Sequence, residues 1–216
     1  MEGMLELLRE ALAYAQSRPE LFWEAFVRHI VLVLTAISIA LVICVPLGVW
    51  TARSRFASLT FINLVNTLRV IPSIAVLFLM LPYFGLSFQS AAIALTILAM
   101  PPILINTDAA FRTMNPAIRE AAQGMGMDAL TIFRTVELPL ALPIILTGVR
   151  TALVEVIASA TLAAFIGAGG LGNFIVLGSQ LRNEAILLVG AIPVAIMAVL
   201  AEVGMSALQR SVQAPL

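Results

Sequence analysis

The chain has 216 residues, of which 61% are hydrophobic and 11% are charged. A soluble globular domain has about 45 to 50% apolar and about 25% charged residues, so this composition indicates a chain that lies in a lipid bilayer. The twelve basic residues are all arginine and balance twelve acids to a net charge of zero, which predicts no nucleic-acid partner. No Gly/Ser-rich or Pro-rich linker divides residues 1–216, so we expect a single transmembrane domain.

Residues 1–24 are predicted to form an amphipathic helix. Leu5, Leu8, Leu12 and Ala15 recur at helical spacing, and the segment carries five acids against two arginines. Such a helix lies on a surface with its apolar side down. The sequence Ser17-Arg18-Pro19-Glu20 then predicts a cap and a restart that turns the chain towards the membrane.

Long apolar runs follow, each with the roughly 20 residues that a helix needs to cross the hydrocarbon. They predict an all-α integral membrane protein with five transmembrane helices, near residues 28–51, 60–82, 89–110, 140–165 and 185–208. Trp23 and Trp50 bracket the first run, where amphipathic indoles favour the interface. An odd number of spans places the two termini on opposite sides of the membrane.

The arginines predict the orientation, because loops on the cytoplasmic side are enriched in basic residues. One face of the predicted bundle carries Arg53, Arg55, Arg112, Arg119, Arg134 and Arg210. We therefore expect that face to be cytoplasmic, with the N-terminus outside and the C-terminus in the cytoplasm.

Four charged residues fall within the predicted spans, where a central charge costs roughly 2.5 to 3.5 kcal/mol on insertion scales. Arg69 and Glu155 lie on different spans, and we expect them to pair as buried charges. Arg150 and Glu202 lie nearer the cytoplasmic ends and are expected to reach water. Asn106 and Asp108, at the inner end of the third span, are candidates for gate or packing groups.

The polar segment 112–138 is the one turn-rich insert between two long apolar runs. Asn115 and Pro116 predict the start of a short helix that runs to about Gln123 and stops at Gly124, before a restart at Gly126 and Asp128. Ile118, Ala122 and Met125 form a narrow apolar stripe beside the small Ala121. A face of this kind fits into the groove of another protein.

The run GAGGLG after the fourth span matches the dinucleotide pattern G-x-G-x-x-G. That pattern requires a preceding strand, a following helix and an acid about twenty residues further on, and none of these is predicted here. We therefore expect a flexible re-entrant loop over the outer mouth of the protein. Its candidate residues are Gly167, Gly169, Gly170, Gly172 and Asn173.

The sequence lacks the parts of an enzyme. His29 is the only histidine and stands at the edge of the first span, so no Ser-His pair in the membrane core and no histidine-cluster metal site is expected. A phosphate-binding G-x-x-x-x-G-K-[ST] loop is also missing from the sequence. We expect a non-catalytic membrane subunit.

Glu120-Ala121-Ala122, Gly126, Val136, Leu138 and Pro139 resemble the EAA loop of ATP-binding cassette (ABC) importer permeases, with Val136 where that pattern usually has isoleucine. The wider segment 101–173 is most similar to the branch that imports glycine betaine, choline, carnitine and related osmoprotectants. The methionine-importer permeases come next. The resemblance implies the type I importer permease fold, in which 112–138 is the cytoplasmic coupling loop and 167–173 is the periplasmic loop between the last two spans. The ATPase-docking residues that it implies are Glu120, Ala121, Ala122, Gly126, Leu138 and Pro139.

The same resemblance implies the partners of the chain. These are ABC ATPase subunits, a second permease copy or a similar permease, an external solute-binding protein and the lipid of the bacterial inner membrane. ATP and Mg would be bound by the partner ATPase, so no cofactor is expected in this chain. Alternative hypotheses are a permease for methionine or another amino acid, an ion-coupled secondary transporter, and a membrane scaffold that transports nothing. A secondary transporter should show an internal repeat or a titratable pathway through the membrane, and the sequence shows neither.

Overall fold

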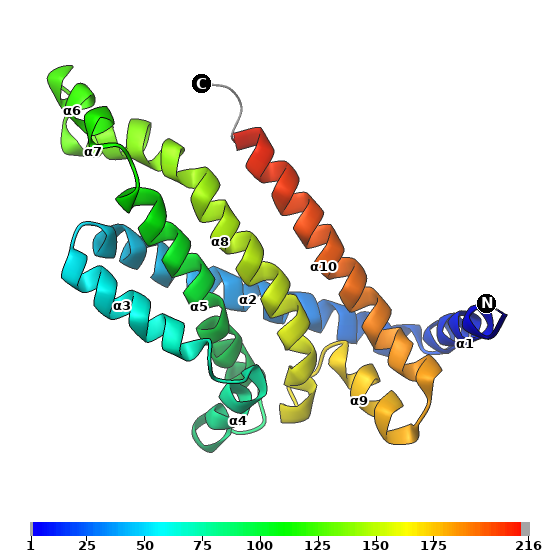
Figure 1. Ribbon diagram of the computed structural model, residues 1–216. Coiled ribbons are helices and arrows are strands. Elements are labelled where there is room, and N and C mark those ends of the chain that lie inside the picture. The colour runs from blue at the N-terminus through cyan, green and yellow to red at the C-terminus, as the bar shows by residue number, and fades with distance from the viewer. Residues whose placement is uncertain (1, 213–216) are drawn as a thin grey trace.

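A computed structural model describes residues 2–212, and every element in this part of the chain is helical (Figure 1). In chain order the elements are α1 (Glu2–Ser17), α2 (Pro19–Ala52), α3 (Arg55–Leu68), α4 (Ser73–Phe84), α5 (Phe88–Arg112), α6 (Pro116–Gly124), α7 (Ala129–Ile132), η1 (Phe133–Glu137), α8 (Leu138–Ser159), η2 (Ala160–Ile166), α9 (Gly172–Leu181) and α10 (Glu184–Val212).

Four helical segments are long and apolar enough to cross a membrane: Pro19–Ala52, Phe88–Arg112, Ala129–Ile166 and Glu184–Val212. The predicted span at 60–82 is instead broken into α3 and α4, which meet at an angle of 94°. Pro72 accounts for the break, because a proline disfavours helical geometry in the residue before it and cannot donate a helix hydrogen bond. The number of spans reaches five only when this bent pair counts as one.

Helix α5 is the centre of the bundle and packs against α2, α3, α4 and α8 (Figure 1). Two glycines let the neighbouring backbones approach it closely. A Cβ at Gly48 of α2 would lie 2.6 Å from Cβ of Thr107, and a Cβ at Gly148 of α8 would lie 2.5 Å from the carbonyl oxygen of Pro102. Small residues have this role in membrane helix packing, where close contact replaces the hydrophobic effect.

The N-terminal helix ends earlier than predicted. Helix α1 stops at Ser17, and residues 19–24 already belong to α2, which begins at Pro19. Ala11 is buried, and the α1 backbone packs against α10, whereas Leu5 and Leu12 are exposed. The helix therefore lies against the bundle on one side and leaves its leucine side uncovered.

The two ends of the bundle differ in what they carry. The α6 end holds α6, α7 and the end of α10, and the α9 end holds α9 and the start of α10 (Figure 1). Between them, Arg150 of α8 and Glu202 of α10 form an ion pair. Both side chains reach the surface, as expected, with 34% and 43% of their areas exposed, and the ion pair additionally joins α8 to α10.

Candidate functional site

Segment 112–138 forms a helical hairpin that projects beyond the rest of the bundle (Figure 1). We call residues 116–132, which contain α6 and α7, the hairpin. The predicted helix start is confirmed: the side-chain oxygen of Asn115 accepts a hydrogen bond from the Ala117 backbone N–H at 3.0 Å, and Pro116 is at the first turn. Asp128 caps α7 by accepting from the Thr131 N–H at 2.7 Å. The Thr131 hydroxyl and backbone N–H hold the pKa of Asp128 below its usual value, so this cap stays ionised at neutral pH.

Helix α6 ends at Gly124, as predicted, but the left-handed residue of the turn is Gly126. Gly124 is the last residue of α6, whereas Gly126 has φ +82°, a left-handed conformation that costs little only in glycine. The N–H of Met125 donates to Ala121 and that of Gly126 to Gln123, which closes the end of α6. A side chain at Gly126 would strain the backbone although no atom lies within 4 Å of its Cβ position.

The hairpin exposes only part of the predicted apolar stripe. Ala122 is 2% exposed and packs inside the loop, so it cannot contact a partner directly. Its neighbours Glu120 and Ala121 are exposed, and so are Ile118 and Met125. We call Ile118, Glu120, Ala121 and Met125 the exposed hairpin face. Of the other residues predicted for docking, Leu138 is half-buried and Pro139 is exposed at the base of the hairpin, where α8 begins.

Two contacts fasten the hairpin to the spans, and the sequence had indicated neither. The Arg119 guanidinium lies 3.5 Å from the carboxylate of Glu137, which is buried in η1. The rings of Phe111 and Phe133 stack with their centroids 5.9 Å apart. This stacking joins the end of α5 to η1. Because η1 continues into α8, the hairpin is connected to both α5 and α8.

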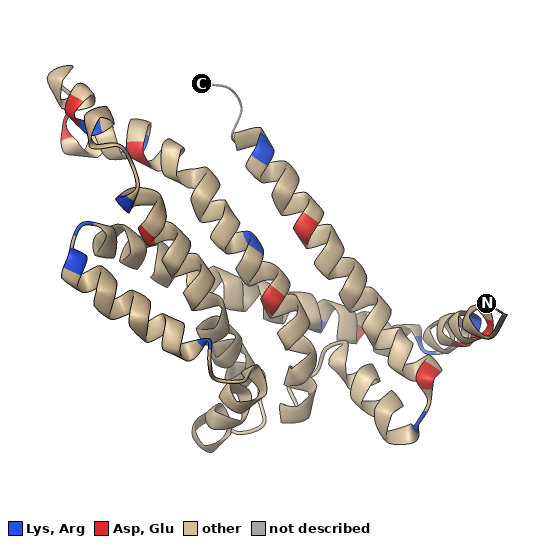
Figure 2. Ribbon diagram, in the orientation of Figure 1, with Lys and Arg blue, Asp and Glu red and all other residues tan. Residues whose placement is uncertain are grey.

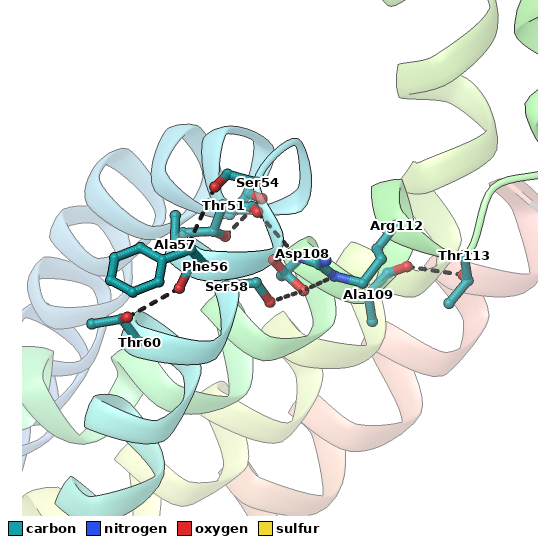
Figure 3. A network of polar contacts seen from close by, with 11 residues as sticks. Thr51, Ser54, Phe56, Ala57, Ser58, Thr60, Asp108, Ala109, Arg112 and Thr113 are labelled. Carbon is teal, nitrogen blue, oxygen red and sulfur yellow. Dashed lines mark hydrogen bonds and ion pairs between the residues drawn. The ribbon is translucent and has the colours of Figure 1, made fainter.

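A polar network crosses α2, α3 and α5 one turn before the hairpin (Figure 3). Asp108 accepts from the Arg112 guanidinium at 2.9 Å on each carboxylate oxygen, and the Ser58 hydroxyl donates to the same carboxylate at 3.1 Å. Nη2 of Arg112 also donates to the carbonyl oxygen of Thr51 at 2.9 Å. We call Thr51, Ser58, Asp108 and Arg112 the clamp.

Of the two roles considered for Asp108, gate residue or packing group, the contacts of the clamp support the packing role. Its side chain is 7% exposed, and an ionised carboxylate can be held there because all its partners donate to it. Asn106, the other candidate, donates to the carbonyl oxygen of Pro102 at 2.8 Å. The role of Ser58 could not be predicted from the sequence, because this residue lies 50 positions from Asp108 and follows no local pattern.

The predicted buried pair of Arg69 and Glu155 is wrong in two respects. Arg69 is exposed and Glu155 is half-buried, and no ion pair joins them within residues 2–212. Both side chains instead line one pocket of about 180 Å³ between α3, α4, α5 and α8.

The glycine run forms a packed connection instead of the predicted flexible loop. Gly167, Gly169 and Gly170 have left-handed φ angles, and Gly172 starts α9. The Arg28 guanidinium donates to the carbonyl oxygen of Ala168 at 3.0 Å, which fastens the run to α2. Asn173 is exposed and, with Gly167, Gly169 and Gly170, lines a pocket of about 420 Å³ at the α9 end.

His29 lies behind this connection and is fully buried. Its Nε2 is 3.1 Å from the carbonyl oxygen of Ile157, near the end of α8, and its Nδ1 has no hydrogen-bond partner. A Cβ at Gly170 would lie 3.3 Å from that Nδ1. His29 thus joins α2, the end of α8 and the glycine run.

Comparison with known sequences assigns this architecture to a family. The model of the binding-protein-dependent transport system inner membrane component matches residues 44–214. The chain is 36% identical to the carnitine transport permease protein OpuCD of Listeria monocytogenes, over 96% of this chain and 93% of the relative. It is 37% identical to the choline transport system permease protein OpuBB of Bacillus subtilis over 88% of each. Identity to the osmoprotectant import permease protein OsmW of Salmonella typhimurium is 37%, over 80% of this chain and 82% of the relative.

Solved structures share the fold. A chain of the MetNI methionine ABC transporter, in an inward-facing conformation, superposes with a TM-score of 0.78 at 23% identity over 91% of this chain and 98% of that chain. A chain of an amino acid ABC transporter gives 0.72 at 20% identity, over 93% and 97%. The chain therefore has the type I importer permease fold and belongs to the binding-protein-dependent transport system inner membrane components, the permease subunits of ABC importers.

Proposed function

We propose that this permease carries a small quaternary-ammonium osmoprotectant, such as glycine betaine, choline or carnitine, across the bacterial inner membrane. The named relatives support the substrate class, because carnitine, choline and osmoprotectant permeases align with most of the chain. The observation that carries the transport role is the projecting hairpin, whose exposed face is mostly apolar with one charge, Glu120, and whose base is fastened to α5 and α8. This shape suits the transmission of force from an external partner to the spans.

The partners follow from the two ends of the bundle. In this proposal an ABC ATPase docks on the exposed hairpin face, a second permease copy or a similar permease completes the passage, and a solute-binding protein delivers substrate at the α9 end. Basic side chains gather around the α6 end, in the hairpin, the α2–α3 connection and the ends of α5 and α10 (Figure 2). The positive-inside rule then makes the α6 end cytoplasmic, with the N-terminus outside.

The clamp and the hairpin contacts suggest how ATP is used. The ATPase partner binds ATP and Mg, and closure of its two copies pulls on the hairpin. Arg119–Glu137 and Phe111–Phe133 carry that displacement to α8 and α5, and the clamp makes α2 and α3 move with α5. The bundle then exchanges an outward-open for an inward-open cavity. Nucleotide shifts this equilibrium only to the extent that it binds the two states differently.

Transport of methionine or another amino acid is the second candidate, since the matching solved structures are amino-acid importers. At identities of 23% and 20%, these structures show that the fold is shared, but they give no information about the substrate of this chain. An ion-coupled secondary transporter would have no use for the hairpin. The relatives at 36 to 37% identity favour the osmoprotectant class.

The substrate is tested by uptake in proteoliposomes. The permease, reconstituted with its ATPase and binding protein, is expected to take up radiolabelled glycine betaine, carnitine or choline only when ATP is supplied to the ATPase side. Methionine serves as the comparison. Uptake of methionine alone, or uptake that needs an ion gradient and no ATP, would overturn the proposal.

The orientation is tested by cysteine labelling in a background where the buried Cys44 is replaced by alanine. Ser58 is buried under Asp108 and is a poor probe, so the exposed Gln123 represents the hairpin. Gln123→Cys is expected to react with a membrane-impermeant maleimide only from the cytoplasm, and Asn173→Cys only from outside. The opposite pattern would invert the roles of the two ends.

A further inference from the structure

The pocket at the break between α3 and α4 carries two opposite charges. It has a volume of about 180 Å³ and is formed by residues 68–73, α5 and the last part of α8. Arg69 lines it from the end of α3, and Glu155 lines it from α8. Ser73 and Ser159 contribute hydroxyl groups, and the remaining wall is apolar. These apolar residues are Leu68, Val70, Ile71, Pro72, Ile97, Leu98 and Pro101.

The two charges line the same pocket and attract each other across it, but neither is held by a close contact. Within residues 2–212, the side chains of Arg69 and Glu155 form no ion pair and no hydrogen bond. Two other charged groups of the spans do have close partners, since Asp108 is held by Arg112 and Arg150 is held by Glu202. A charge within a membrane segment is costly, and an unpaired one usually belongs to a site or a water-filled passage.

The backbone explains why the two charges face the same space. Pro72 ends the α3 geometry and turns the chain by 94°, which places Arg69 at an open corner of the bundle. Glu155 is one turn before Ser159, where α8 changes from α-helical to 3₁₀ geometry. Irregular backbone at membrane depth is tolerated where it borders a cavity. The pocket is therefore built at two such irregularities, between the α6 end and the α9 end.

We propose that this pocket is a transient binding site for a zwitterion on its way through the permease, with Arg69 receiving the carboxylate and Glu155 the ammonium group. This inference rests on the proposed function. A molecule with both charges neutralises both side chains at once, which neither a cation nor an anion does. A quaternary ammonium group has no hydrogen to donate, so it needs a negative charge and apolar contacts, and Glu155 with Ile97 and Leu98 offers both. The volume, below the roughly 300 to 1,000 Å³ of drug-sized pockets, suits a small solute.

The proposal separates substrates that carry a carboxylate from those that do not. Glycine betaine and carnitine use both charges, whereas choline has no carboxylate and uses Glu155 alone. Arg69→Gln should weaken the binding of glycine betaine by about tenfold or more, the usual loss for a charge-assisted contact, and leave choline binding unchanged or tighter. Glu155→Gln should weaken the binding of both by a similar factor.

The experiment measures equilibrium binding of radiolabelled glycine betaine and choline to the purified permease–ATPase complex without the binding protein, followed by uptake with the binding protein present. Arg69→Lys and Glu155→Asp keep the charges and should retain most of the binding. Arg9→Gln and Glu10→Gln, both exposed on α1 and outside the pocket, are matched controls and should bind like the wild type. Thermal unfolding in detergent shows whether a variant that fails to bind is still folded.

The outcomes separate this inference from the proposed function. Wild-type binding in both Arg69→Gln and Glu155→Gln, in a complex that takes up glycine betaine, would overturn the pocket and leave the function standing. Recovery of binding in the double variant would also overturn it, because the two charges would then serve each other rather than a ligand. A wild-type complex that takes up no quaternary-ammonium compound would refute the proposed function itself, whatever the variants do.

Discussion

Ala121→Trp is expected to abolish transport while the permease still inserts into the membrane at normal abundance. Ala121 is exposed on α6, which packs against α7 and η1, so an indole at this position should not disturb the rest of the bundle. If the hairpin docks in a groove of the ATPase, however, the indole would clash with the wall of that groove, which the small alanine side chain does not reach. A residue at the centre of an interface typically accounts for about 2 kcal/mol or more, so we expect a roughly 30-fold or greater loss of ATPase affinity. The measurement is co-purification of the ATPase and uptake at matched membrane levels.

Gln123→Trp is the control for this prediction. Gln123 is also exposed on α6, but two residues of helix rotate it by about 200° from Ala121, towards the opposite side. It should retain ATPase binding and uptake. Two further variants test the same face differently: Glu120→Arg reverses a charge at its edge, and Gly126→Trp forces a bulky residue into a backbone with φ +82°. Normal transport in Ala121→Trp and Gly126→Trp together would show that the hairpin is not the docking element.

Asp108→Ala is expected to destabilise the α6 end of the bundle and to uncouple ATP hydrolysis from uptake. The substitution removes the acceptor of both Arg112 and Ser58 and leaves the guanidinium with only the carbonyl of Thr51. Removing one partner of a buried ion pair costs roughly 3 to 5 kcal/mol. Because the Arg112 side chain is 33% exposed and can partly rehydrate, we expect a loss of about 3 kcal/mol in the free energy of unfolding, observed as a lower thermal midpoint in detergent. Because α2 and α3 would no longer follow α5, ATP should be hydrolysed with less substrate carried per cycle.

Graded variants separate coupling from simple instability. Ser58→Ala removes one hydrogen bond to the Asp108 carboxylate and should cost about 1.5 kcal/mol with coupling largely kept. Thr113→Ala, at the same end of α5 but with its hydroxyl bonded only to the carbonyl of Ala109, should change neither property. If Asp108→Ala loses stability but keeps the wild-type ratio of substrate carried to ATP hydrolysed, the clamp is structural and takes no part in coupling.

The sequence by itself determined the class of the protein and the local structure of its most informative loop. The membrane class follows from composition, because 61% hydrophobic residues cannot be buried in a soluble chain of this length. The helix starts at Asn115–Pro116 and at Asp128 follow from capping, which depends on residues within three positions of each other. The EAA pattern and the segment 101–173 indicated the permease family before any contact was known.

Only the tertiary structure decided which residues meet and which side of a helix is covered. The periodicity of α6 placed Ala122 on an apolar stripe, but the fold of the loop turned that residue inward and left Ala121 outside. The hydropathy of 60–82 predicted one span, whereas Pro72 and the packing around α5 produced two helices at 94°. Ser58 and Asp108 are 50 positions apart and meet in the clamp, and Arg150 of α8 pairs with Glu202 of α10. The expected pairing of Arg69 with Glu155 failed for the same reason. A charge in a span indicates that a partner or a cavity exists. Which partner or cavity it is depends on how the helices rotate and cross, and the neighbours along the chain do not determine that.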